Sequence, residues 1–80
     1  MRHEASLRFS YDSSDRARRV TRAIDPEIGA IDDDRSRARA DRDGATLTIT
    51  IEARDPVALR ASLNTWLSLV GVAEDAGAVA

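Results

Sequence analysis

Apolar and polar residues alternate along two stretches of the chain, and a period of two is typical of strands that bury one face. In residues 5–11 one side of the alternation consists of Ala5, Leu7, Phe9 and Tyr11. In residues 45–54 leucine and isoleucine alternate with threonine. The first stretch predicts a half-buried strand, and the second predicts the strongest strand of the chain.

A weaker strand is predicted at residues 35–40, where arginine alternates with serine and alanine. Alanine and arginine have little strand propensity, so this assignment depends on its position before a turn. Residues 41–44 end in glycine, which supplies a positive φ, and lead directly into the strand at 45–54. We therefore expect these two strands to form a hairpin.

A first helix is predicted from the capping side chains at residues 12–14 to about Ile24, before Asp25 and Pro26 end it. Its apolar stripe is narrow and consists of Ala17, Val20, Thr21 and Ile24. The opposite side carries three basic residues, Arg18, Arg19 and Arg22.

A second helix is predicted over residues 55–70, because Asp55 can cap the first turn and Pro56 is favourable at the first helical position. Helical spacing places Leu59, Leu63, Trp66 and Val70 on one arc, with Leu67 at its edge. The remaining surface has small or apolar groups: Val57, Ala58, Ala61, Ser62, Thr65, Ser68 and Leu69. Arg60 is the only charge between Pro56 and Val70. A solvated helix normally carries several charges, so we predict that this surface is buried against another protein.

The order strand, helix, strand, strand, helix predicts an α+β fold. We expect a three-stranded antiparallel sheet with both helices on one face, a βαββα arrangement. That face is lined by Leu7, Phe9, Leu47, Ile49 and Ile51. We predict a single domain at residues 1–72 and a flexible C-terminal tail at residues 73–80.

The composition suggests a domain that gains stability by association. With 80 residues and no cysteine, the chain can bury only about 60% of its unfolded surface and has no disulfide. All twelve basic residues are arginine, and aspartate outnumbers glutamate ten to four. Either a GC-rich genome or adaptation to a cytoplasm with a high salt concentration would produce this bias. Neither a signal peptide nor an apolar run of about 20 residues is present, so a soluble, cytoplasmic protein is expected.

Catalytic chemistry is not indicated by the sequence. His3 is the single histidine and lies near the terminus, Ser13 and Ser14 resemble helix caps, and there is no glycine-rich phosphate loop. The three aspartates at residues 32–34 lack the spacing of a calcium loop and are interpreted as a solvated loop. We predict no catalytic residue, no cofactor and no metal.

Two groups of arginines are candidates for nucleic-acid contact. The first is the set on the predicted first helix, and the second consists of Arg8, Arg35, Arg37 and Arg39 on the open face of the predicted sheet. The alternative is that they pair with neighbouring aspartates on a solvated surface. Aromatic residues that would stack on bases are scarce, because Phe9 and Trp66 are assigned to the core.

Arg60 and Asn64 lie one helical turn apart on the same side of the predicted second helix. Asparagine is a poor helix former, so its presence in the middle of a helix calls for a reason. The two residues are either an exposed polar pair or a pair that forms hydrogen bonds across an interface.

Residues 49–69, ITIEARDPVALRASLNTWLSL, resemble the signature of the small dimerising subunit of the KEOPS complex. In that family an alternating strand is followed by a helix that begins at aspartate and carries Leu-Arg-Ala-Ser-x-Asn. The matching residues are Glu52, Ala53, Asp55, Leu59, Arg60, Ala61, Ser62 and Asn64. Weaker agreement extends upstream. Thr65 stands where the family usually has serine, and Ala38 and Ala40 replace bulkier strand residues.

The resemblance implies a non-catalytic scaffold that forms a homodimer with the strands joined into a larger sheet. Its helices would bind the catalytic threonylcarbamoyltransferase subunit, in a complex that installs threonylcarbamoyladenosine beside the anticodon of tRNA. The implied partner-binding residues are Val57, Arg60, Ala61, Asn64, Thr65, Ser68 and Leu69. The candidate tRNA contacts are Arg18, Arg19, Arg22, Arg35, Arg37 and Arg39. A nucleic-acid-binding transcription or chromatin regulator and a stand-alone interaction module are the alternatives.

Overall fold

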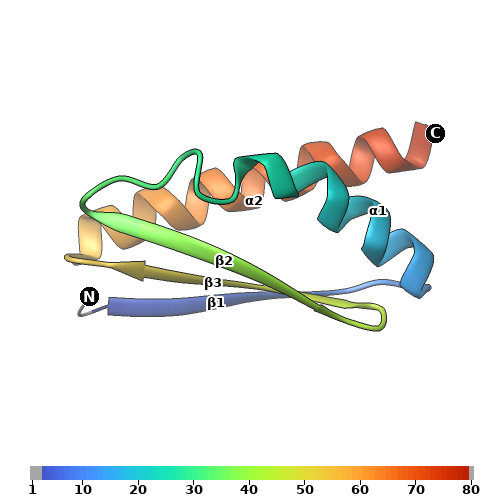
Figure 1. Cartoon of the computed structure of the whole chain (residues 1–80), viewed down its shortest axis with the longest axis horizontal. Helices are drawn as coiled ribbons and strands as arrows, with labels where there is room; N and C mark the ends of the chain where they lie inside the picture. Colours follow the sequence, from blue (N-terminus) through green and yellow to red (C-terminus); the bar gives the residue numbers. More distant parts are fainter. Residues whose placement is uncertain (1–2, 80) are drawn as a thin grey trace.

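The computed structural model describes residues 3–79, with side chains described as far as Ala76 (Figure 1). The elements follow the order β1 (His3–Ser10), α1 (Ser14–Ile24), the short 3-10 helix η1 (Asp25–Glu27), β2 (Ser36–Asp43), β3 (Thr46–Ala53) and α2 (Pro56–Val79). The predicted α+β class and βαββα order are confirmed.

The three strands form one antiparallel sheet in the order β1-β3-β2, so the strongest predicted strand lies in the middle. His3 pairs with Ala53 at one end of β1, and Ser36 pairs with the same residue from β2. Both helices lie on one face of the sheet, and the other face is uncovered (Figure 1). β1 and β2 are therefore the two edge strands.

The core lies between the sheet and the helices. Leu47, Ile49 and Ile51 of β3 are fully buried, and Leu7 and Phe9 of β1 are partly buried against them. The helices cover this face with buried side chains from both elements: Val20 and Ile24 from α1, and Trp66, Val70 and Ala73 from α2. The apolar face predicted for the sheet is confirmed.

Helix α1 begins at a cap that the sequence offered. The Ser13 side chain accepts a hydrogen bond of 3.1 Å from the Arg16 N–H, which satisfies one of the free donors of the first turn. Ala17, Val20 and Ile24 are buried as predicted. The helix then continues into η1, where Pro26 lies in the first turn.

The predicted hairpin is confirmed, but its turn lies later in the chain than the predicted residues 41–44. β2 continues through Asp43, and Gly44 and Ala45 form a two-residue turn in which Gly44 has φ of +61°. A positive φ at the first position is typical of a type II′ turn, which glycine accommodates without steric cost. The first strand is also shifted: it covers His3–Ser10, and Tyr11 follows it with its N–H bonded to the Ala45 carbonyl.

The predicted end of the second helix at Val70 is wrong. α2 continues to Val79, because Gly71 does not interrupt it and the following turn has contacts that hold it. Ala73 is buried in the core, and Glu74 accepts a hydrogen bond from Tyr11. The 24 residues of α2 span the 36 Å length of the molecule. The flexibility of residues 73–80 stays a prediction, and Met1, Arg2 and Ala80 lie outside the described residues.

Candidate functional site

The surface of α2 that points away from the sheet is the main candidate. Six of the seven predicted partner-binding residues are exposed there: Val57, Arg60, Ala61, Asn64, Thr65 and Ser68. We call these six residues the outer face of α2. Val57 is 71% exposed, which is high for an apolar side chain. The outer face carries one charge, that of Arg60.

Three residues of α2 lie elsewhere than the sequence indicated. Leu69 is half-buried against the core instead of beside the outer face, and Ala58 is buried at the start of the helix. Leu67, placed at the edge of the core arc, is 48% exposed. Small differences in helix tilt over the sheet decide such boundary positions, and the sequence does not specify that tilt.

An apolar residue of this surface was missed because the helix was ended too early. Val72 is 68% exposed and lies one turn beyond Ser68 at helical spacing. With Leu67 it extends the apolar surface of α2 toward the C-terminus. The signal that would have found Val72 is the alanine-rich sequence after Gly71, which is compatible with a helix.

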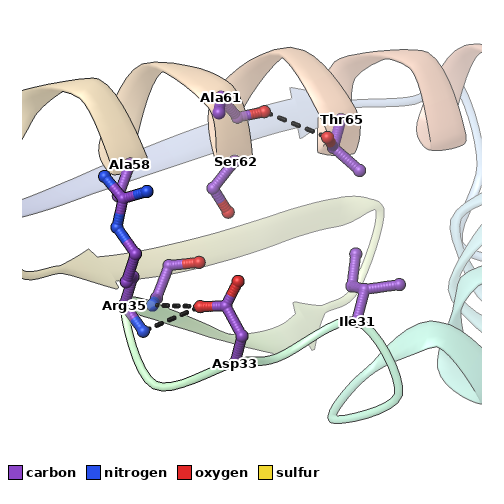
Figure 2. Close-up of a pocket in the computed structure, with 8 residues that line it drawn as sticks. Ile31, Asp33, Arg35, Ala58, Ala61, Ser62 and Thr65 are labelled. Carbon is purple, nitrogen blue, oxygen red and sulfur yellow. Dashed lines mark hydrogen bonds between the residues drawn. The ribbon is translucent and has the colours of Figure 1, made fainter.

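A groove of about 200 Å³ lies between the N-terminal half of α2 and the loop before β2 (Figure 2). Ala61 and Thr65 of the outer face line it, so the groove and the outer face are continuous. The remaining lining residues are Ile31, Asp33, Arg35, Ser36, Ala58 and Ser62. Small side chains on the helix keep this groove open, and Thr65 directs its hydroxyl back to the Ala61 carbonyl at 3.0 Å.

The loop before β2 forms one wall of the groove, and the carboxylate of Asp33 stabilises its conformation. Asp33 accepts hydrogen bonds from the backbone N–H groups of Arg35 and Ser36 at 2.8 and 2.9 Å, as Figure 2 shows. These bonds stabilise the charged form and hold the pKa of the Asp33 carboxyl below its usual value. Asp33, one of the three aspartates at residues 32–34, thus has a local structural role in this loop.

Arg35, which lines the groove, forms an ion pair with Asp55, the residue before α2. Arg35 Nη2 lies 3.1 Å from Asp55 Oδ2, and Asp55 Oδ1 accepts the Ala58 N–H at 2.8 Å. The hydrogen bond from the Ala58 N–H is the largest cause that lowers the pKa of the Asp55 carboxyl, and the hydrogen bond from the Arg35 guanidinium is the second. Asp55 therefore caps α2, as predicted, and also fixes the loop that precedes β2.

The arginines predicted to contact tRNA do not form one surface. Arg18, Arg19 and Arg22 are exposed on α1, and Arg18 pairs with Asp15 at 2.9 Å. Arg37 and Arg39 are exposed on the open face of the sheet, where Arg39 lies 3.4 Å from Glu52. Arg35 does not join Arg37 and Arg39, because its side chain forms an ion pair with Asp55 at the start of α2. Two smaller basic groups result.

Arg8 belongs to the open face of the sheet but has a different neighbourhood. In the sheet register Arg8 and Asp41 both lie opposite Thr48, on its two sides. Serine and threonine fill the middle of this face, so it offers hydroxyl groups between separated charges. No aromatic residue occupies an open-face position of the described strands, so these strands offer no ring on that face on which a base could stack.

Within the described part of the chain, no three His, Cys, Asp or Glu side chains are placed to hold a metal ion. The same part contains no helix that is both long enough and apolar enough to cross a membrane.

A match to a protein-family model agrees with the resemblance seen in the sequence. No curated protein gives a significant match to the chain. A family model described as transcription factor Pcc1 matches residues 4–76, which covers β1 from Glu4 onward, α1, β2, β3 and most of α2. The chain belongs to the Pcc1 family, the family of the small accessory subunit of KEOPS complexes.

Proposed function

We propose that the protein is a non-catalytic scaffold of a KEOPS-type complex in the cytoplasm. It forms a homodimer and binds the catalytic threonylcarbamoyltransferase subunit, which supports threonylcarbamoyladenosine modification of tRNA next to the anticodon. Family membership supports the type of complex. The outer face of α2 supports the mode of binding, because it combines exposed apolar and small residues with a single charge.

The outer face suits packing against helices of a partner. Ala61 and Ser68 are small and allow a close approach, and Val57 supplies apolar area at the N-terminal end. Arg60 and Asn64 add directional hydrogen bonds to the same surface. The groove beside Ala61 and Thr65 gives a partner side chain a place to insert.

The test is light scattering of the purified chain, alone and mixed with the catalytic threonylcarbamoyltransferase subunit from the same source, at low and high potassium chloride. We expect a dimer that forms a complex resistant to salt, since the surface is mostly uncharged. If no complex with the catalytic subunit is detected at any salt concentration, the scaffold function is refuted.

A variant locates the contact. Ala61→Arg adds bulk and charge at the centre of the outer face and is expected to abolish complex formation. Ala30→Arg places the same change at an exposed turn residue outside both helices and should leave the complex intact. A complex that forms normally with Ala61→Arg would show that the outer face is not the binding surface.

The alternative function is a nucleic-acid-binding regulator of transcription. Two observations favour it: the family description, and the exposed arginines of α1. Under this alternative the chain would bind generic duplex DNA with a strong dependence on salt. Charge reversal at Arg19 and Arg22 would then abolish DNA binding and leave the protein complex unchanged.

A further inference from the structure

Two polar groups of the groove beside α2 have no hydrogen-bond partner in the part of the chain that the structure describes. Asp33 Oδ1 accepts both backbone hydrogen bonds of the loop, so the second carboxylate oxygen, Oδ2, is left over. The Ser62 hydroxyl is the other group. In Figure 2 the two side chains point into the space between the loop and the helix, one from each side. Both oxygens can accept a hydrogen bond from a donor placed between them.

The unbalanced charge in the groove is negative. Arg35 is the one cation among the described lining residues, and its Nη2 atom lies 3.2 and 3.1 Å from the two carboxylate oxygens of Asp55. Among the described ion pairs, none involves Asp33. The backbone hydrogen bonds to Asp33 also favour its ionised form. The groove therefore repels an anion and attracts a cation.

The rest of the groove is lined by apolar or small groups. Ile31 is 38% exposed and lies at the end opposite to Arg35, and Ala61 contributes only a methyl group. The Thr65 hydroxyl is bonded to the Ala61 carbonyl, which leaves its methyl group for the groove. The hydrocarbon stem of a lysine or arginine can pack on such groups while its charged end reaches a carboxylate. A volume of about 200 Å³ suits one side chain and is small for a separate organic ligand.

We propose that the groove receives one lysine or arginine side chain of the protein that packs on the outer face of α2. The stem of this side chain lies along Ile31 and Thr65, and its cationic group donates hydrogen bonds to Asp33 Oδ2 and to the Ser62 hydroxyl. This inference rests on the proposed scaffold function and adds the chemistry of one contact: the partner surface carries a basic side chain that reaches the loop before β2.

The place of Asp33 beside the outer face makes a matching cation necessary. Ala61 and Thr65 belong to both the outer face and the groove, so a partner seated on the outer face also removes water from the groove. A carboxylate that loses its water without gaining a partner strongly opposes binding. A basic side chain replaces the lost water contacts with a charge-assisted hydrogen bond.

Side chains of other classes fit the groove less well. An acidic side chain would bring its charge next to Asp33, while Arg35 is already paired with Asp55. An apolar side chain would fill the end near Ile31 and leave the carboxylate covered and unpaired. These two occupants predict that binding becomes stronger when the charge of Asp33 is removed, and a basic occupant predicts that it becomes weaker.

Asp33→Asn gives a direct test, because the amide keeps an oxygen for the two loop N–H groups and removes the charge. We expect it to raise the dissociation constant of the complex with the catalytic subunit about 10-fold to 100-fold in isothermal titration. Asp34→Asn is the matched control, since Asp34 is exposed and does not line the groove, and it should bind like the unmodified chain. Ser62→Leu fills the groove without a change of charge and should also weaken binding. Circular dichroism checks that each variant is folded.

A double-mutant cycle identifies the inserted side chain. Each basic residue on the subunit's contact surface is replaced by methionine, and for one of them the loss of affinity should largely disappear in the Asp33→Asn background. If Asp33→Asn binds as tightly as the unmodified chain or more tightly, or loses no more affinity than Asp34→Asn, the basic contact is overturned and the scaffold function stands. Full binding by Ser62→Leu would also overturn the insertion. An unmodified chain that does not bind the subunit would overturn the scaffold function itself.

Discussion

Tyr11 Oη donates a hydrogen bond of 2.8 Å to Glu74 Oε2, although the two residues lie 63 positions apart in the sequence. The bond joins the end of β1 to the late turns of α2, and the Arg16 guanidinium lies 5.8 Å from the centre of the Tyr11 ring. Burial, together with the carboxylate of Glu74, raises the pKa of the Tyr11 phenol. Together with the burial of Ala73, this contact ties the part of α2 beyond Val70 to the rest of the domain.

Replacing Tyr11 with phenylalanine should lower the free energy of unfolding by about 1–2 kcal/mol, since it removes a partly buried, charge-assisted hydrogen bond. Urea unfolding at neutral pH measures the loss. Glu74→Gln keeps an acceptor and should cost less. If Tyr11→Phe has full stability, the late turns of α2 are not held by this contact.

The cap of α2 should make stability depend on acid. The pKa of Asp55 is lowered in the folded state, so its contribution is complete above the ordinary value of 3.8 and is lost as pH falls through the depressed value. Asp55→Ala should therefore lower the thermal midpoint by several degrees at neutral pH, and the difference from the unmodified chain should shrink in acid. A difference that does not vary with pH would contradict the cap.

Two glycines should respond to alanine in opposite directions. Gly44→Ala places a side chain at φ of +61° and should destabilise the hairpin by about 1 kcal/mol, although no atom lies within 4 Å of the added group. Gly71→Ala adds a good helix former in open space on α2 and should stabilise by about 0.5–1 kcal/mol. Thermal unfolding of both variants checks the pair. Destabilisation by Gly71→Ala would argue against a continuous α2.

The polar pair of the outer face should affect binding and not folding. Arg60 and Asn64 are exposed, and no hydrogen bond between them and another described side chain is observed. Alanine at both positions should weaken the complex with the catalytic subunit about 10-fold to 100-fold, because it leaves buried partner groups unpaired. Isothermal titration measures this change. Unchanged binding would identify them as an ordinary exposed pair.

Much of the fold was predictable because its signals are local. The alternation of apolar and polar residues identified β1 and β3, and Ser13 and Asp55 lie at the predicted helix caps. β2 has weak strand propensity, but its position in a hairpin was sufficient to predict it. The boundaries were less predictable. The part of α2 beyond Val70 makes the contact between Glu74 and Tyr11, which connects distant parts of the chain and leaves no periodic signal.

The part of the candidate site that lies on α2 could be predicted from the sequence. The part formed between α2 and the loop before β2 could not. The presence of only one charge, Arg60, between Pro56 and Val70 was the signal that indicated the outer face of α2. The groove could not be foreseen, since it depends on how the loop before β2 passes the helix. Arg35 shows the same limit: its strand parity placed it with Arg37 and Arg39, and the ion pair with Asp55 turned it to the other side.

The strand order has a consequence for synthesis on the ribosome. β1 emerges first, but its neighbour in the sheet is β3, and the apolar face of both is completed only by Trp66 and Val70 of the last helix. Long-range contacts of this kind form late, so the domain closes only after nearly the whole chain has been made. A nascent or truncated product that ends before α2 would leave Leu47, Ile49 and Ile51 without the helix that covers them in the folded domain.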